Sequence, residues 1–367
     1  MKMLNRLLVG LGIAALAGCV YSVQAGVATQ SKSAGHIVAT GSMSVARFDH
    51  TATLLSNDKV LIVGGLARNG VAEPTAELFD LTTGRFTPTG KLQSPRGWGT
   101  TAVRLANGEV LIAGGSNGSC VSCYLATAEL YDPAKGTFSA TGSMSVARVG
   151  ARAALLPNGD ALIVGGAETG GSAATAEVYH PASGMFTAAV RMHIPDPSQV
   201  VVLKDNNVLV IGSSGAELYD SGTGQFTVTG RMSVPRTKFG AALLPDGRVL
   251  IVGGQVGGAW GVRVASTQVY NPASRTFSDG PELNLKRFKL VKAVVPLKDG
   301  TLLVGGGADQ PEIYDPESGK FHLAGGVKLD GFLFSTATGL ANGEVLLAGG
   351  YATPGGAGVS HAWLYRR

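Results

Sequence analysis

The sequence predicts an all-β fold, a β-propeller whose seven blades close into a ring. Three observations predict it. A β-rich run that ends in two small residues occurs seven times, and these doublets recur every 41 to 53 residues. A tight-turn pair precedes each run, and further strand-like segments follow it. Four short antiparallel strands per unit are typical of a propeller blade.

Composition limits the class of protein. Glycine accounts for 54 of 367 residues without a three-residue period, which excludes a collagen-like chain. The 45% hydrophobic content excludes global disorder. Only 15% of the residues are charged, and the net charge of +5 is dispersed along the chain. This balance does not predict nucleic-acid binding.

The first residues are typical of a secretory signal. Lys2 and Arg6 are followed by an apolar run over 7–17, which is too short to span a bilayer. The tetrapeptide Leu16-Ala17-Gly18-Cys19 then resembles a bacterial lipobox, in which the cysteine is acylated and becomes the mature N-terminus.

We therefore expect a signal peptide over 1–18, lipidation of Cys19 and a tether over 19–34. The alternative is ordinary cleavage after Ala25, which gives a signal peptide over 1–25. Both predict an exported protein, either an outer-membrane lipoprotein, as resemblance to Gram-negative lipoproteins implies, or a periplasmic or secreted protein. We expect membrane contact only through the lipid anchor.

Each predicted blade follows one pattern. The second strand is the apolar run, found at 60–65, 110–115, 161–166, 208–213, 249–254, 302–307 and 345–350. The turn pairs before it supply the positive φ of short hairpins, and they are Asn57-Asp58, Asn107-Gly108, Asn158-Gly159, Asp205-Asn206, Asp246-Gly247, Asp299-Gly300 and Asn342-Gly343. A variable loop follows each doublet, then a third strand such as 128–131. The fourth strands contain Phe86, Phe138, Phe186, Phe226, Phe277 and Phe321.

This pattern resembles the kelch repeat, a hydrophobic run, a glycine doublet and a spaced aromatic pair. The units look most like those of the galactose-oxidase propeller and of bacterial kelch proteins. Two features depart from the family: phenylalanine stands where the last strand usually has tryptophan, and Gly212-Ser213 replaces one doublet. The resemblance covers about 35–367, which we expect to be a single seven-bladed domain.

The two ends of the chain fit a closed ring. The last unit ends after its third strand, at 362–365, and lacks a fourth. Residues 35–41 resemble the fourth strand at 136–142. We therefore expect the N-terminal strand to complete the last blade, which leaves only short protected edges.

Two cysteines follow the lipobox. Cys120 and Cys123 are close enough to form a local disulfide within one loop, as expected in an oxidising compartment. The alternatives are a redox or metal role, but the segment has neither a helical context nor a neighbouring His cluster. We expect no metal and no cofactor.

The doublet loops are candidate ligand-binding segments, because in propellers these loops emerge on one face near the channel. They contain Tyr124, Trp260, Arg263, Tyr351 and His361, and Trp98 lies on the same side. Aromatic rings beside an arginine suit carbohydrate stacking or a protein hot spot. The alternative is that Trp98 and Trp260 only cover neighbouring blades.

Five arginines recur near the start of the innermost strands: Arg47, Arg96, Arg148, Arg236 and Arg287. Convergence at a channel mouth would favour a bound anion, such as a carboxylate or a sulfate. The alternative is a structural pair with the third-strand residues Glu77, Glu129, Glu177, Glu312 and Gln268.

Two kelch enzymes provide further hypotheses. The copper site of the galactose-oxidase family needs two Tyr, two His and a Cys crosslinked to one Tyr; here Tyr179-His180 looks like a turn, and the copper hypothesis fails. A sialic-acid mutarotase would need an acid or base beside an anion clamp. Arg236 or Arg287 with His50, Asp49 or Asp196 are the candidates.

The sequence thus favours a monomeric binding module at the cell envelope, whose partner is a protein or an acidic glycan on the doublet-loop face. A carbohydrate-active enzyme of the mutarotase kind is the alternative.

Overall fold

The computed structural model describes residues 34–119, 123–168, 171–172, 174–194, 196–258, 261–353 and 356–367. All of them belong to one compact unit, Ser33–Arg367. Within these ranges the regular secondary structure is β-strand throughout, and none of the described residues forms a helix long and apolar enough to cross a membrane.

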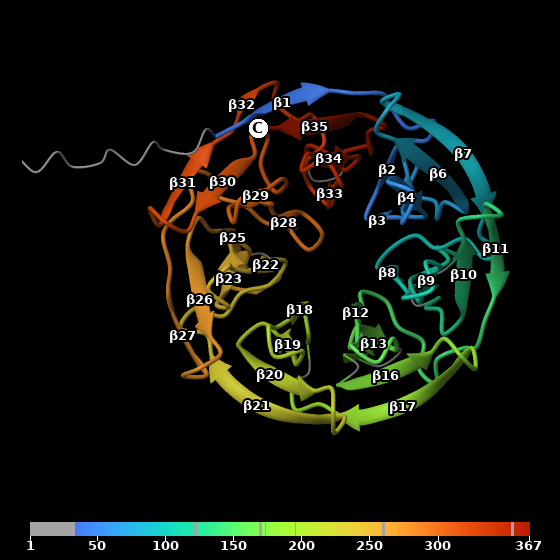
Figure 1. The fold of residues 1–367 in the computed structure, drawn as a ribbon, viewed down its shortest axis with the longest axis horizontal. Helices are drawn as coiled ribbons and strands as arrows, with labels where there is room; N and C mark the ends of the chain where they lie inside the picture. The colour runs from blue at the N-terminus through green and yellow to red at the C-terminus, as the bar shows by residue number, and fades with distance from the viewer. Residues whose placement is uncertain are drawn as a thin grey trace, which may run out of the picture. The chain divides into compact units, whose positions relative to one another are not determined.

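The strands form seven four-stranded antiparallel blades, arranged around a central axis (Figure 1). Blades one to three consist of β3 (Thr51–Leu54), β4 (Lys59–Val63), β6 (Thr75–Asp80) and β7 (Arg85–Lys91); β8 (Thr101–Arg104), β9 (Val110–Ala113), β10 (Ala128–Asp132) and β11 (Thr137–Ala140); and β12 (Arg152–Leu155), β13 (Ala161–Val164), β16 (Thr175–His180) and β17 (Met185–Arg191). Blades four to six consist of β18 (Gln199–Val202), β19 (Val208–Ile211), β20 (Gly215–Asp220) and β21 (Gln225–Arg231); β22 (Gly240–Leu243), β23 (Val249–Val252), β26 (Thr267–Asn271) and β27 (Thr276–Asp279); and β28 (Val294–Pro296), β29 (Leu302–Val304), β30 (Glu312–Asp315) and β31 (Lys320–Leu323).

The seventh blade closes the ring with both ends of the described chain. It consists of β33 (Thr336–Gly339), β34 (Val345–Ala348), β35 (Ala362–Arg366) and β1 (His36–Ala39). Strand β1 pairs antiparallel with β35, from His36 opposite Arg366 to Ala39 opposite Trp363. The predicted seven-bladed fold and its N-terminal closure are therefore confirmed. A short strand, β32 (Gly325–Gly326), adds a parallel fifth strand that the sequence analysis did not predict.

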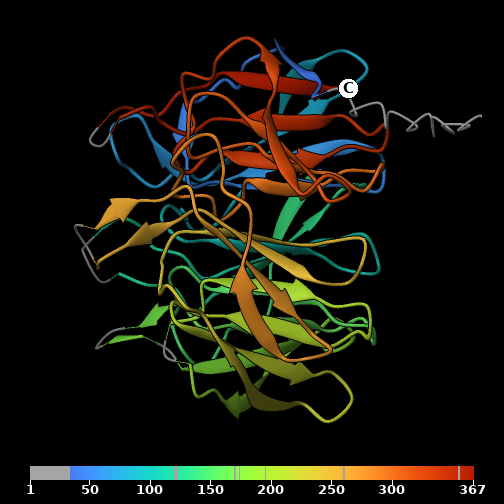
Figure 2. The same ribbon diagram turned by 90° about the vertical axis from the view of Figure 1, so that its left-hand side faces the viewer.

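Three small antiparallel pairs include strands of the doublet loops. These are β2 (Arg47–Phe48) with β5 (Leu66–Ala67), β14 (Ala167–Glu168) with β15 (Gly171–Ser172), and β24 (Gln255–Val256) with β25 (Val262–Arg263). The green pair β14–β15 and the gold pair β24–β25 project from the same face in Figure 2. We call this the doublet-loop face.

The hydrophobic core lies between neighbouring blades. In one cluster Val60 and Phe79 of blade one pack with Leu346 and Leu364 of blade seven. The second strands are buried along their whole length because a blade covers each side, which explains their continuous apolar runs. The doublet glycines allow close contact at the strand ends: at Gly65, with φ 86°, a Cβ would lie 2.6 Å from the Phe48 carbonyl oxygen.

A tilted Tyr–Phe pair links the third and fourth strands of most blades. In blade two the rings of Tyr131 and Phe138 lie 4.8 Å apart, and the Tyr131 hydroxyl bonds Thr89 Oγ1 of blade one at 2.9 Å. Tyr365 of blade seven is equally buried, but its hydroxyl has no hydrogen-bond partner among the described residues. Burial raises the pKa of Tyr365 to about 12.

These two tyrosines predict opposite responses to loss of the hydroxyl. Tyr131→Phe removes a made hydrogen bond, so we expect the free energy of unfolding to fall by about 1 kcal/mol. Tyr365→Phe removes an unpaired buried hydroxyl, so stability should stay equal or rise. Chemical denaturation of both variants measures the difference; equal losses would contradict this account of the Tyr–Thr bond.

Candidate functional site

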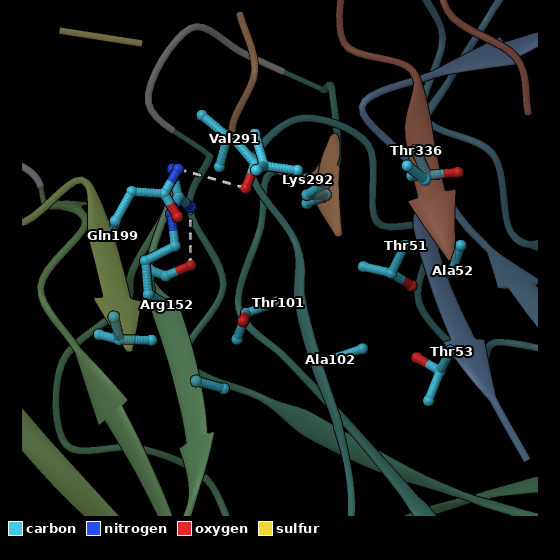
Figure 3. A pocket seen from close by; sticks show the side chains of 15 residues that line it. Thr51, Ala52, Thr53, Thr101, Ala102, Arg152, Gln199, Val291, Lys292 and Thr336 are labelled. Atoms are coloured by element: carbon cyan, nitrogen blue, oxygen red, sulfur yellow. Dashed lines mark hydrogen bonds between the residues drawn. The ribbon is translucent and has the colours of Figure 1, made fainter. Parts of the chain in front are cut away.

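A polar cavity of about 290 Å³ lies among the innermost strands (Figure 3). Its lining comes from six blades, namely β3, β8, β12, β18, β28 with the two residues before Ala293, and β33. We call it the axial pocket; its lining includes Thr51, Thr53, Thr101, Arg152, Gln199, Lys292 and Thr336. Thr51 pairs with Val63, directly before a glycine doublet, so the pocket lies at the doublet-loop end of the channel.

Arg152 enters this pocket from the first position of β12. Its Nε donates to the Ser198 carbonyl at 2.8 Å, and its Nη1 donates to the carbonyls of Gly150 and Ala151 at 2.7 and 3.0 Å. Nη2 has no acceptor among the described residues, and no carboxylate there pairs with this guanidinium. Burial lowers the pKa of Arg152 to about 10, and Asp49 opposes that shift.

Lys292 adds a second cation. Its ammonium donates to the carbonyls of Asp49, His50 and Thr100 at 3.0–3.3 Å and lies 3.5 Å from the Asp49 carboxylate. Burial lowers the pKa of Lys292, while Asp49 acts in the opposite direction. Asp49 is itself fixed, because its Oδ2 accepts the Gly99 N–H at 2.6 Å.

Four non-glycine residues adopt positive φ shortly before innermost strands: Asp49 (54°), Lys238 (55°) and Phe334 (55°) two residues before, and Lys289 (61°) five residues before. Blades two and three have Gly99 and Gly150 in this slot. Left-handed backbone at non-glycine residues is uncommon and concentrates at functional sites. The slot therefore presents two lysines and an aspartate at one end of the channel.

Lys289 sits among aromatic rings. Its Nζ lies 5.1, 4.8 and 4.9 Å from the ring centroids of Phe288, Phe334 and Tyr351, and it donates to the Tyr351 hydroxyl. Burial lowers the pKa of Lys289 to about 8, and the nearby charges of Lys238 and Arg263 add to this shift. We call Lys238, Arg263 and Lys289 the rim cations.

The predicted aromatic candidates are only partly brought together. Trp98 is 40% exposed and contacts Phe48 and Phe334 edge-on, and Phe48 in turn contacts Tyr351. Tyr351 is buried within this cluster. Tyr124 is half-buried and bridges to Ser116 instead. Trp260 lies outside the described residues.

The recurring arginines do not converge on the channel mouth, which corrects that expectation. Arg47, Arg96, Arg148, Arg236 and Arg287 precede the innermost strands and are 0–1% exposed. Each Nη1 donates to a doublet glycine carbonyl, as Arg96 does to Gly114 at 3.0 Å. Four of them pair with the third-strand glutamate of their own blade at 2.9–3.1 Å. This geometry matches the structural alternative, in which the arginine ties the doublet to the third strand.

Blades four and five each lack one partner. Arg236 bonds the carbonyls of Gly253 and Ser266 but not Gln268, whose amide bonds Ser233 and Asp279 instead. Glu217 has no arginine and accepts the backbone N–H groups of His193 and Ile194. The expected pairing with Gln268 is therefore wrong, because that side chain has its own partners.

Cys123 is disulfide-bonded. Cys120 and Cys19 lie outside the described residues, so the Cys120–Cys123 pairing and the lipidation of Cys19 stay predictions.

The described histidines do not offer a copper site. His50 is fully buried and bonds Thr336 Oγ1 at 3.0 Å, while burial keeps its pKa well below the usual value. His180, at the end of β16, pairs with Asp160. Among the described residues, no group of three or more His, Cys, Asp or Glu is placed to hold a metal ion. These donors do not fit the copper set of the galactose-oxidase family.

Comparison with known proteins agrees with the fold. The Kelch motif model matches residues 101–145, which span blade two. This chain carries a Kelch motif. A solved structure of a fungal alcohol oxidase of the AA5 family, in complex with copper, matches with a TM-score of 0.70 and 17% identity, over 90% of this chain and 76% of the oxidase. At this identity the likeness concerns the fold alone. No curated protein matches the chain in sequence.

The predictions made from the sequence did not include the cations of the axial pocket. Arg152 occupies the strand position that Thr51, Thr101 and Thr336 hold in other blades. A charge where the repeats carry hydroxyls is a signal that comparison of the units could have found.

Proposed function

We propose that this Kelch propeller is a binding module for acidic glycans, which it engages on the doublet-loop face. The observation that carries the proposal is an excess of cations at one end of the channel. Arg152 and Lys292 line the axial pocket. The rim cations Lys238, Arg263 and Lys289 form a second group, in which the charges of Lys238 and Arg263 lower the pKa of Lys289. Among the described residues, Asp49 alone lies within ion-pair distance of any of these five. Such a charge excess attracts an anionic partner.

The aromatic cluster supports a saccharide as that partner. Trp98 is 40% exposed beside Phe48 and Phe334, and an amphipathic ring can cover the apolar face of a sugar. Hydroxyls of Thr53 and Thr101 line the pocket and can exchange hydrogen bonds with sugar hydroxyls. The mutarotase alternative has less support, because three of its candidate residues, Arg236, Arg287 and His50, are buried.

A glycan array probed with the full-length protein tests the proposal. We expect signals on uronate-containing and other acidic glycans and none on their neutral counterparts. Binding to neutral glycans alone, or no glycan binding while a protein of the cell envelope is captured, would contradict it and favour a protein partner.

The charge on Lys289 predicts a pH dependence. Its pKa of about 8 means that the amine is mostly charged at pH 7 and mostly neutral at pH 9, whereas a carboxylate ligand stays ionised. We expect the affinity for an acidic glycan to fall about two- to fivefold over this interval. Lys289→Arg should flatten the profile; an unchanged profile in that variant would contradict this assignment.

We also propose that the chain is exported and lipid-anchored, on the strength of Lys2, Arg6 and the lipobox ending in Cys19. Metabolic labelling with a fatty-acid analogue should mark the wild type and not Cys19→Ser. Labelling of neither, with a mature N-terminus at Gly26, would support cleavage after Ala25 instead.

A further inference from the structure

We propose that the axial pocket takes the terminal acidic sugar of the glycan, with its carboxylate bound to Nη2 of Arg152. This rests on the proposed function and makes it more specific: the propeller would recognise the end of an acidic chain rather than its interior.

The guanidinium of Arg152 has N–H groups available to an anion. A guanidinium has five N–H groups, and three of them are used by the carbonyls of Ser198, Gly150 and Ala151. These bonds hold the plane of the group in place. The two N–H groups of Nη2 have no acceptor among the described residues, although the side chain lines a cavity. A charged donor without a partner in a polar cavity binds a carboxylate more strongly than an exposed arginine does.

The surrounding groups complement a hydroxylated acid. Lys292 uses its N–H groups on backbone carbonyls, so it contributes positive charge rather than a direct bond. Gln199 donates through Nε2 to the carbonyls of Phe239 and Val291, and its Oε1, with no donor among the described residues, can accept a sugar hydroxyl. Thr53 and Thr101 add hydroxyls. The pocket thus offers donors for one carboxylate and partners for several hydroxyls.

The size and position of the pocket favour a chain end. Its volume of about 290 Å³ is at the lower limit of ligand pockets, which suits one sugar unit. The lining from Thr51 to Thr53 spans two residue rises, roughly 7 Å along the strand. Six blades surround the pocket, so a ligand enters along the axis. A terminal sugar has one linkage, which can leave through the mouth, whereas an internal sugar has two and would require the chain to thread the channel.

Isothermal titration of the full-length protein tests this with three oligosaccharides of equal length. The first ends in glucuronate, the second ends in its methyl ester, and the third has glucuronate only in the interior. We expect the ester and the internal acid to bind about 10- to 100-fold more weakly than the terminal acid. These comparisons require no variant.

Arg152→Gln should reduce binding of the terminal acid by the same factor. The matched control is Arg104→Gln. Arg104 is the last residue of the innermost strand β8, whereas Arg152 is the first residue of β12, and the Arg104 side chain is exposed. One result would overturn the end-on inference and leave the proposed function intact. In that result, terminal and internal acids bind equally, Arg152→Gln binds as tightly as the wild type, and replacing Lys238 and Lys289 by glutamine still abolishes binding. No binding of any acidic oligosaccharide would overturn both.

Discussion

Arg96→Met is expected to lower the free energy of unfolding by about 3–5 kcal/mol. The guanidinium is fully buried and lies 3.1 Å from Glu129, which is also buried. Its removal leaves the Glu129 carboxylate, among the described residues, with only the backbone N–H groups of Gln93 and Ser94 as donors. It also leaves the carbonyls of Gly114 and Thr127 without this donor. Denaturant titration of the full-length variant measures the loss.

Arg236→Met is the matched control. Arg236 is equally buried and binds the equivalent carbonyls of Gly253 and Ser266, but among the described residues no carboxylate lies at ion-pair distance from it. We expect roughly half the loss, because no buried charge is left unpaired. Equal losses in the two variants would show that packing of the arginine stem, not the ion pair, stabilises the blades.

The second large effect concerns binding. Replacing Lys238 and Lys289 together by glutamine should weaken binding of an acidic glycan by about 10- to 100-fold. Both lysines are half-buried at the doublet-loop end, where screening by solvent is incomplete. The fold should persist, because among the described residues the Lys238 side chain bonds only the Gln255 side chain, at 3.4 Å, and because burial already disfavours the charged form of Lys289. Affinity measured by titration decides the result.

The control for charge alone is the double substitution Lys135→Gln with Lys298→Gln. Both lysines are exposed in turns at the far ends of their blades, between β10 and β11 and between β28 and β29. This double substitution removes the same net charge from the face opposite the doublet-loop face. If both double variants lose affinity equally, the interaction depends on net charge, and no site on the doublet-loop face is needed.

Much of the fold could be predicted because each repeat carries its own evidence. The apolar runs, turn pairs and doublets mark strand ends locally, and comparison of 35–41 with 136–142 was enough to predict the pairing of β1 with β35. Strand β32 was missed because two glycines carry no strand pattern. Its pairing depends on the position of β1, which is remote in sequence.

The candidate site was harder to predict for a physical reason. Residues that recur in most repeats, such as Arg96, are the easiest to recognise in the sequence. Because all blades need the same internal contacts, residues that recur in this way stabilise the blades. The axial pocket depends on residues that break the pattern, Arg152 and Lys292, and these lie 140 positions apart in the sequence. Only ring closure brings their blades around one cavity. Likewise, the pKa of Lys289 is lowered by burial and by the charges of Lys238 and Arg263, which belong to the preceding blade and lie far from Lys289 in the sequence.

The most direct test of the account is a titration of the full-length protein with one acidic oligosaccharide and with its carboxyl-reduced, neutral counterpart, at low and physiological ionic strength. The cation excess around the axial pocket predicts that only the acid binds and that its affinity falls as salt is added. Equal affinity for both saccharides, or binding that does not respond to salt, would contradict the central claim that charge at the doublet-loop end selects the ligand.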